Sequence, residues 1–108
     1  MSERITELVL PIKRKWFDMI IAGDKTEEYR EIKPYWTKRF KTIGLLDGGG
    51  NPTHNKALVT FRNGYGKDAP EFMAWVTMDI GDGLRNWGAE PGARYYVLVI
   101  NSIVKVVN

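Results

Sequence analysis

The chain has 108 residues, of which 44% are hydrophobic, and this length suits one hydrophobic core rather than two. It contains no cysteine and one histidine, which excludes disulfide bonds, zinc sites built on sulfur and multi-histidine metal centres, so we expect neither a metal nor a cofactor. The net charge is +3, and residues 1–41 hold ten Lys and Arg against seven Asp and Glu, an imbalance that suits a polyanionic partner.

The first part of the chain predicts strands and helices that alternate. Pro11 ends the first strand, and Gly23 ends the first helix because glycine tolerates the left-handed backbone conformation. Pro34 suits the first turn of a second helix. In chain order, the predicted elements are a strand over residues 6–10, a helix over 13–22, a strand over 26–32 and a helix over 34–40.

The rest of the chain predicts strands alone. A glycine-rich loop over residues 46–52 precedes three segments rich in β-branched and aromatic residues, at 56–62, 71–80 and 94–107. Asn63 and Gly64 favour a hairpin turn between the first two of them. These elements predict one α+β domain over residues 1–108, a small and mostly antiparallel β-barrel of about five strands with two short helices in its N-terminal half.

The location of the protein is predicted from two absences in the sequence. No segment approaches the roughly 20 apolar residues that a membrane-spanning helix requires. The N-terminal residues also lack the succession of charged, apolar and small-residue regions that marks a signal peptide. We therefore expect a cytoplasmic protein without a membrane partner.

Three charged residues, Lys25, Glu28 and Arg30, surround the start of the predicted strand over residues 26–32. Because strand side chains alternate between faces, Glu28 and Arg30 share a face, and Lys25 lies where the strand begins. A carboxylate and a guanidinium side by side can present an acceptor and a fork of donors to a nucleobase next to a phosphate. The alternative is a surface salt bridge, which contributes about 0–1 kcal/mol to stability.

These residues carry a resemblance to a known family. Gly23, Lys25, Glu28 and Arg30 match the G-x-K-x-x-E-x-R motif of ASCH domains, and the segment over residues 10–23 resembles the strand and helix that precede it there. Residues 63–66, 87–89 and 95–100 resemble the variant found in phage and prophage genes. The resemblance implies a PUA-like barrel with the motif residues lining a cleft between helix and barrel.

The resemblance leaves several functions open. ASCH domains are generally inferred to bind RNA, which implies an RNA- or nucleotide-binding module. Some resemble hydrolases of a modified nucleoside, of the N4-acetylcytidine amidohydrolase type, and others a ribonuclease; here Lys25 and Glu28 would be the catalytic residues. In the amidohydrolases a threonine nucleophile lies three residues after the motif lysine, but this chain has Glu28 there. An interaction protein with a vestigial cleft is a third alternative.

The charge of Lys25 bears on this choice. A desolvated lysine beside Arg30 could act as a general base, but a neighbouring carboxylate stabilises the ammonium. We therefore expect Lys25 to titrate no lower than an ordinary lysine and to meet phosphate as a cation.

Aromatic and basic residues complete the predicted site. Trp16, Phe17 and Trp75 fall at positions expected to face the core. Other aromatic residues lie in a short helix or in loops, where they either stack on bases or form a lid over one end of the barrel. The predicted nucleic-acid-binding residues are Lys13, Lys25, Glu28, Arg30, Trp36, Arg39, Arg62, Tyr65 and Trp87.

Overall fold

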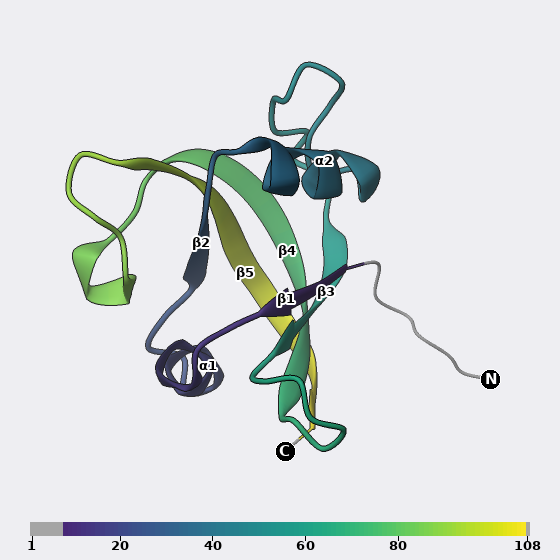
Figure 1. Cartoon of the computed structure of the whole chain (residues 1–108), viewed down its shortest axis with the longest axis vertical. Coiled ribbons are helices and arrows are strands. Elements are labelled where there is room, and N and C mark those ends of the chain that lie inside the picture. The colour runs from purple at the N-terminus through teal and green to yellow at the C-terminus, as the bar shows by residue number, and fades with distance from the viewer. Residues whose placement is uncertain (1–7, 108) are drawn as a thin grey trace.

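The computed structural model describes residues 8–107, which form one small α+β domain with five strands and two helices (Figure 1). This confirms the predicted class and the two short helices in the N-terminal half. Within these residues, no helix is long and apolar enough to cross a membrane. The elements are β1 (Leu8–Pro11), α1 (Arg14–Ile21), β2 (Glu27–Glu31), α2 (Pro34–Thr42), β3 (Ala57–Arg62), β4 (Glu71–Asp82), the 3₁₀ helix η1 (Arg85–Trp87) and β5 (Arg94–Val107).

The predicted boundaries differ from the observed ones mainly at the first strand. Pro11 is the last residue of β1 instead of following it, which an edge strand tolerates because one side of its backbone has no strand partner. Residues 6 and 7 of the predicted strand lie outside the described residues. The turn predicted at Asn63 and Gly64 belongs to the connection between β3 and β4, and Gly64 has a φ of 103°.

The five strands form one mixed sheet in the order β1-β3-β4-β5-β2. β1 runs parallel to β3, and the other neighbours are antiparallel, as most of the sheet was predicted to be. The prediction of a barrel is not confirmed, because β1 and β2 stand at opposite ends of the strand order and the sheet stays open between them. We call this gap between β1 and β2 the seam.

The sheet nevertheless curves strongly, so that β1 crosses in front of β4 and β5 in Figure 1, while β2 lies beside β5. The pairing of β4 with β5 shifts register between Met73 and Ala74 and between Trp75 and Val76, where β5 has an extra residue, Val104 and Asn101 respectively; such bulges bend a strand and increase its twist. The edge strands β1 and β2 have four and five residues, against 12 and 14 in β4 and β5. β1 and β2 do not pair with each other, so no strand ladder closes the seam.

The hydrophobic core fills the concave side of the sheet. Phe17 of α1 contacts Phe72 of β4 with 5.3 Å between ring centroids, and Phe40 of α2 contacts Tyr96 of β5 at 5.4 Å. Both helices therefore cover the core from the side of the seam. Trp75 does not face the core as predicted: it is 39% exposed, because the alternation of β4 buries its neighbours and turns this ring outward.

The connection between β4 and β5 packs closely against β2. A Cβ atom added to Gly83 would lie 2.6 Å from Cβ of Ala89 and 2.7 Å from the Tyr29 ring. The Tyr29 hydroxyl accepts a hydrogen bond from the Leu84 N–H at 3.0 Å and donates one to Glu27 Oε1 at 2.7 Å. Burial raises the pKa of Tyr29 to about 12, so the hydroxyl keeps its proton even at moderately alkaline pH. Glycine at position 83 therefore allows the connection to reach β2.

Replacing Gly83 by alanine should lower the free energy of unfolding by about 1–3 kcal/mol, because the added methyl overpacks the contact with Tyr29 and Ala89. The matched control is Gly81→Ala, whose added methyl would have no atom within 4 Å. It should change stability by about 0.5 kcal/mol or less. Urea denaturation of both variants measures the difference, and equal losses would contradict close packing at Gly83.

Candidate functional site

The motif residues Lys25, Glu28 and Arg30 meet in one buried cluster next to the seam. Gly23 follows the C-cap of α1, and its φ of 84° turns the chain back toward β2. β2 then places Glu28 and Arg30 on the same face, as the alternation predicts. Glu28 Oε1 lies 2.6 Å from Lys25 Nζ, and Glu28 Oε2 lies 2.6 Å from Arg30 Nη1. One carboxylate therefore pairs with two cations, and the pair of Glu28 and Arg30 is largely buried instead of forming the surface salt bridge that was the alternative.

Lys25 is enclosed by aromatic rings. Its side chain is 0% exposed, and Nζ lies 5.4 Å, 5.3 Å and 6.0 Å from the ring centroids of Trp16, Tyr29 and Trp87. Nζ also donates to the carbonyl oxygen of Glu27. The structure thus separates Lys25 from solvent, and the Trp87 ring forms part of its cover.

Burial lowers the pKa of Lys25 below its ordinary value of 10.5, and the charge of Arg30 adds to this effect. The carboxylate of Glu28 acts in the opposite direction but does not compensate for the loss of hydration. The expectation that Lys25 titrates no lower than an ordinary lysine is therefore wrong. It gave the charge of Glu28 more weight than the desolvation of Lys25, whereas the surrounding rings make desolvation the larger effect.

Arg30 spans the seam. In addition to Glu28, its guanidinium donates to the carbonyl oxygen of Tyr29 at 2.8 Å and, across the gap, to that of Pro11 in β1 at 2.5 Å. The guanidinium carbon lies 5.4 Å from the centroid of the Trp36 ring. Arg30 thus joins the two edges of the sheet, and its side chain remains 12% exposed.

Two open pockets flank this bridge. The first, of about 500 Å³, is lined by Lys33 and the start of α2, and contains the Tyr35 and Trp36 rings. The second, of about 310 Å³, lies at the end of β1 and is lined by Pro11, Ile12, Lys13, Asn63, Gly64 and Tyr65. We call the two pockets, with Arg30 between them, the seam surface.

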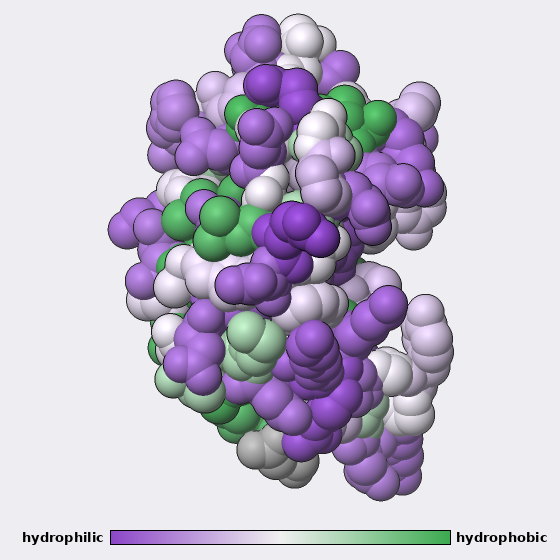
Figure 2. Space-filling view, turned by 90° about the vertical axis from the view of Figure 1, so that its left-hand side faces the viewer, coloured by the Kyte–Doolittle hydropathy of each residue, from purple (hydrophilic) through white to green (hydrophobic). Residues whose placement is uncertain are grey.

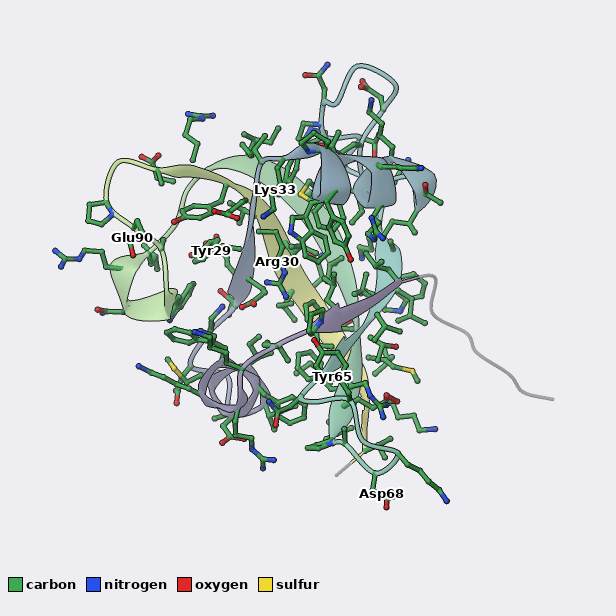
Figure 3. The ribbon with its side chains drawn as sticks, in the orientation of Figure 1. Tyr29, Arg30, Lys33, Tyr65, Asp68 and Glu90 are labelled. Carbon is green, nitrogen blue, oxygen red and sulfur yellow. The ribbon has the colours of Figure 1, made fainter. Side chains whose placement is uncertain are left out.

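The figures show how the seam surface lies on the molecule. Lys33, Arg30 and Tyr65 follow one another from top to bottom across the front in Figure 3. Figure 2 shows the outline of the molecule indented along its right-hand edge, which corresponds to the front of Figure 1, between an upper and a lower lobe. The seam surface is therefore concave and accessible from one side.

The structure brings together some of the other predicted residues and separates the rest. Lys13 and Tyr65 lie in the same pocket although 52 positions separate them in the chain, and Tyr65 is 92% exposed. Arg62 lines a smaller pocket beside Tyr65, but pairs with Glu71 at 2.9 Å. Arg39 lies 3.5 Å from the centroid of the Tyr35 ring, on α2. Only part of the predicted set faces the seam surface.

The predicted set of nucleic-acid-binding residues leaves out Lys33 and Tyr35, which line the first pocket. The signal was present, because both directly follow the motif strand in the segment Lys33–Trp36, where a basic residue precedes two aromatic ones. Among residues 8–107, no group of three or more His, Cys, Asp or Glu side chains is arranged to hold a metal ion.

Comparison of the chain with models of known protein families, with curated proteins and with solved structures finds no match. The resemblance to ASCH domains therefore depends on the sequence motif and its context, and the family stays a prediction.

Glu28→Gln should destabilise the protein by about 3–5 kcal/mol, because it leaves two buried cations without their shared counter-charge. The matched control is Asp18→Asn in the exposed pair of Arg14 and Asp18, where both side chains are 58% exposed. That loss should stay within about 0–1 kcal/mol. Chemical denaturation of both variants at neutral pH compares them; a loss for Glu28→Gln as small as the control would show that the buried cluster does not stabilise the fold.

Proposed function

We propose that the protein is a PUA-like module that binds single-stranded RNA or a nucleotide at the seam surface. The observation that supports this most directly is the gathering of Lys13, Lys33, Trp36 and Tyr65 around Arg30. In this proposal the curved sheet is an open form of the PUA-like barrel, and the seam is its ligand-binding side.

The chemistry of the seam surface suits a nucleic acid. Cations at phosphates release condensed counterions, and exposed rings stack on bases with little regard to sequence. Tyr65 below the bridge and Tyr35 above it, 53% exposed, are such rings. Lys13 and Lys33 are exposed beside them. The surface therefore offers a cation and a ring on each side of the seam.

The role of Arg30 in this proposal differs from the fork of donors expected from the sequence. Its two terminal nitrogens already donate to Glu28, Tyr29 and Pro11. The guanidinium contributes a fixed positive charge and a planar face next to Trp36. Arg30 acts by holding the seam at a constant width and by attracting the ligand, while the flanking side chains make the contacts.

Binding of fluorescein-labelled oligouridine, measured by anisotropy, tests the proposal. Affinity should fall as salt rises. Tyr65→Ala should weaken binding by about 1–3 kcal/mol, the loss of one base stack. The control is Trp75→Ala, which removes an exposed ring from the outer face of β4 and should leave affinity unchanged.

Two results would overturn the proposal. One is the absence of binding at low salt. The other is an equal loss in the Tyr65 and Trp75 variants, since it would show that the seam surface has no advantage over the opposite face of the sheet.

A hydrolase acting on a modified nucleoside is the second candidate, favoured by the lowered pKa of Lys25. A lysine whose pKa is lowered by burial is typical of a general base. Against this, Nζ donates to Glu28 and Glu27, and Trp16 and Trp87 lie over it. Glu28 also occupies the position where an acyl-transfer mechanism would place its hydroxyl nucleophile. This candidate therefore ranks below binding.

We expect N4-acetylcytidine to be hydrolysed no faster by the wild-type protein than by Lys25→Met, because no aligned hydroxyl is available to form an acyl intermediate. Release of cytidine, followed by ultraviolet absorbance, provides the measurement. Turnover by the wild type that disappears in Lys25→Met would place the hydrolase first.

A further inference from the structure

A further pocket, which we call the α2 pocket, adjoins the seam surface on α2. It has a volume of about 480 Å³ and shares Lys33 and Pro34 with the first pocket. Its other lining residues are Ile32, Thr37, Lys38 and Lys41. The two pockets therefore form a continuous path from the seam, around the start of α2, onto the outer side of that helix.

The α2 pocket is strongly positive. Its three titratable lining side chains are all lysines. Lys33 pairs with Glu31 at 2.9 Å, but within residues 8–107 no carboxylate lies at ion-pairing distance from Lys38 or Lys41. The chain from residue 33 to 56 contains five Lys or Arg and one acidic residue, Asp47. Two of the three lysines are thus free to neutralise an anion.

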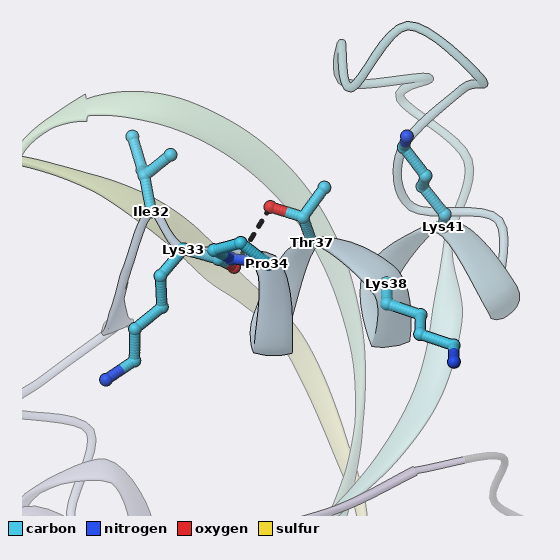
Figure 4. A pocket seen from close by; sticks show the side chains of 6 residues that line it. All are labelled: Ile32, Lys33, Pro34, Thr37, Lys38 and Lys41. Carbon is cyan, nitrogen blue, oxygen red and sulfur yellow. Dashed lines mark hydrogen bonds between the residues drawn. The ribbon is translucent and has the colours of Figure 1, made fainter.

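The spacing of the lysines points to a chain of phosphates rather than to one. Figure 4 shows the side chains of Lys33, Lys38 and Lys41 pointing in different directions instead of converging on one point. Eight residues separate the first from the last, or about 12 Å at 1.5 Å per helical residue, whereas one strand of a duplex carries a phosphate about every 3.4 Å. A single phosphate would leave at least one lysine unused.

We propose that the α2 pocket is a phosphate-backbone subsite, and that the ligand is a single-stranded oligonucleotide whose chain continues from the seam surface over α2. This inference rests on the proposed function and specifies its ligand class. The exposed Tyr35 ring, on the face that Arg39 does not cover, receives a base in the first pocket, and the lysines follow the backbone of the adjoining nucleotides. The exposed Ile32 gives the pocket an apolar floor beside which a ribose can lie.

The test compares oligouridines of about 4 and about 12 nucleotides, lengths within the range of single-stranded binding sites. The wild type should bind the longer oligomer more tightly. The double variant Lys38→Ala/Lys41→Ala should lose this advantage while binding the short oligomer normally. Its salt slope should be less steep by about 1.4, since each phosphate contact on a single strand contributes about 0.7. Between about 50 and about 200 mM salt, wild-type affinity should then fall about sevenfold further than that of the variant.

The matched control is Lys15→Ala/Lys105→Ala, which removes two exposed lysines outside the α2 pocket. It should leave both the length advantage and the salt slope unchanged. If both double variants reduce the slope equally, the effect is diffuse charge and the subsite is wrong. If short oligomers bind and Tyr65→Ala weakens them, but Lys38→Ala/Lys41→Ala changes nothing, the proposed function stands and the subsite fails. If no oligomer binds at low salt, both proposals fail.

Discussion

The carboxylate of Glu28 stabilises the molecule next to the seam, where β1 and β2 are not joined by strand pairing. A buried charge is costly unless it is paired and hydrogen-bonded, and Glu28 satisfies Lys25 with one oxygen and Arg30 with the other. Arg30 in turn reaches the carbonyl oxygen of Pro11. The two sheet edges are thus connected through side chains, and the width of the seam follows from the length of one arginine.

This arrangement separates two tasks within a short segment. The motif residues are occupied with one another: Lys25 has no exposed surface, and the terminal nitrogens of Arg30 donate to protein atoms. The exposed side chains lie around them, on α2 and on the connection between β3 and β4. In the proposed binding mode, the motif therefore acts as a buried support, and the exposed side chains around it make the contacts with the ligand.

Much of the secondary structure could be predicted from the sequence, because its signals are local. Pro34 and Gly23 mark helix ends, and alternation placed Glu28 beside Arg30. Closure of the sheet could not be predicted, since it depends on how far edge strands extend and where bulges bend their partners. The enclosure of Lys25 was also missed, because its aromatic neighbours come from three segments that are brought together only by the fold. Trp75 was predicted to face the core, but the alternation of β4 turns its ring outward.

The connection between β4 and β5 has a consequence for proton binding. It covers Lys25 with Trp87 and is tied to β2 through the N–H of Leu84, yet the backbone around it is largely exposed. Such segments detach at a lower free energy than central strands. Detachment admits water to Lys25, whose pKa then returns toward that of an ordinary lysine. Between the two pKa values each local opening takes up one proton, so the closed state gains stability as pH rises through that range.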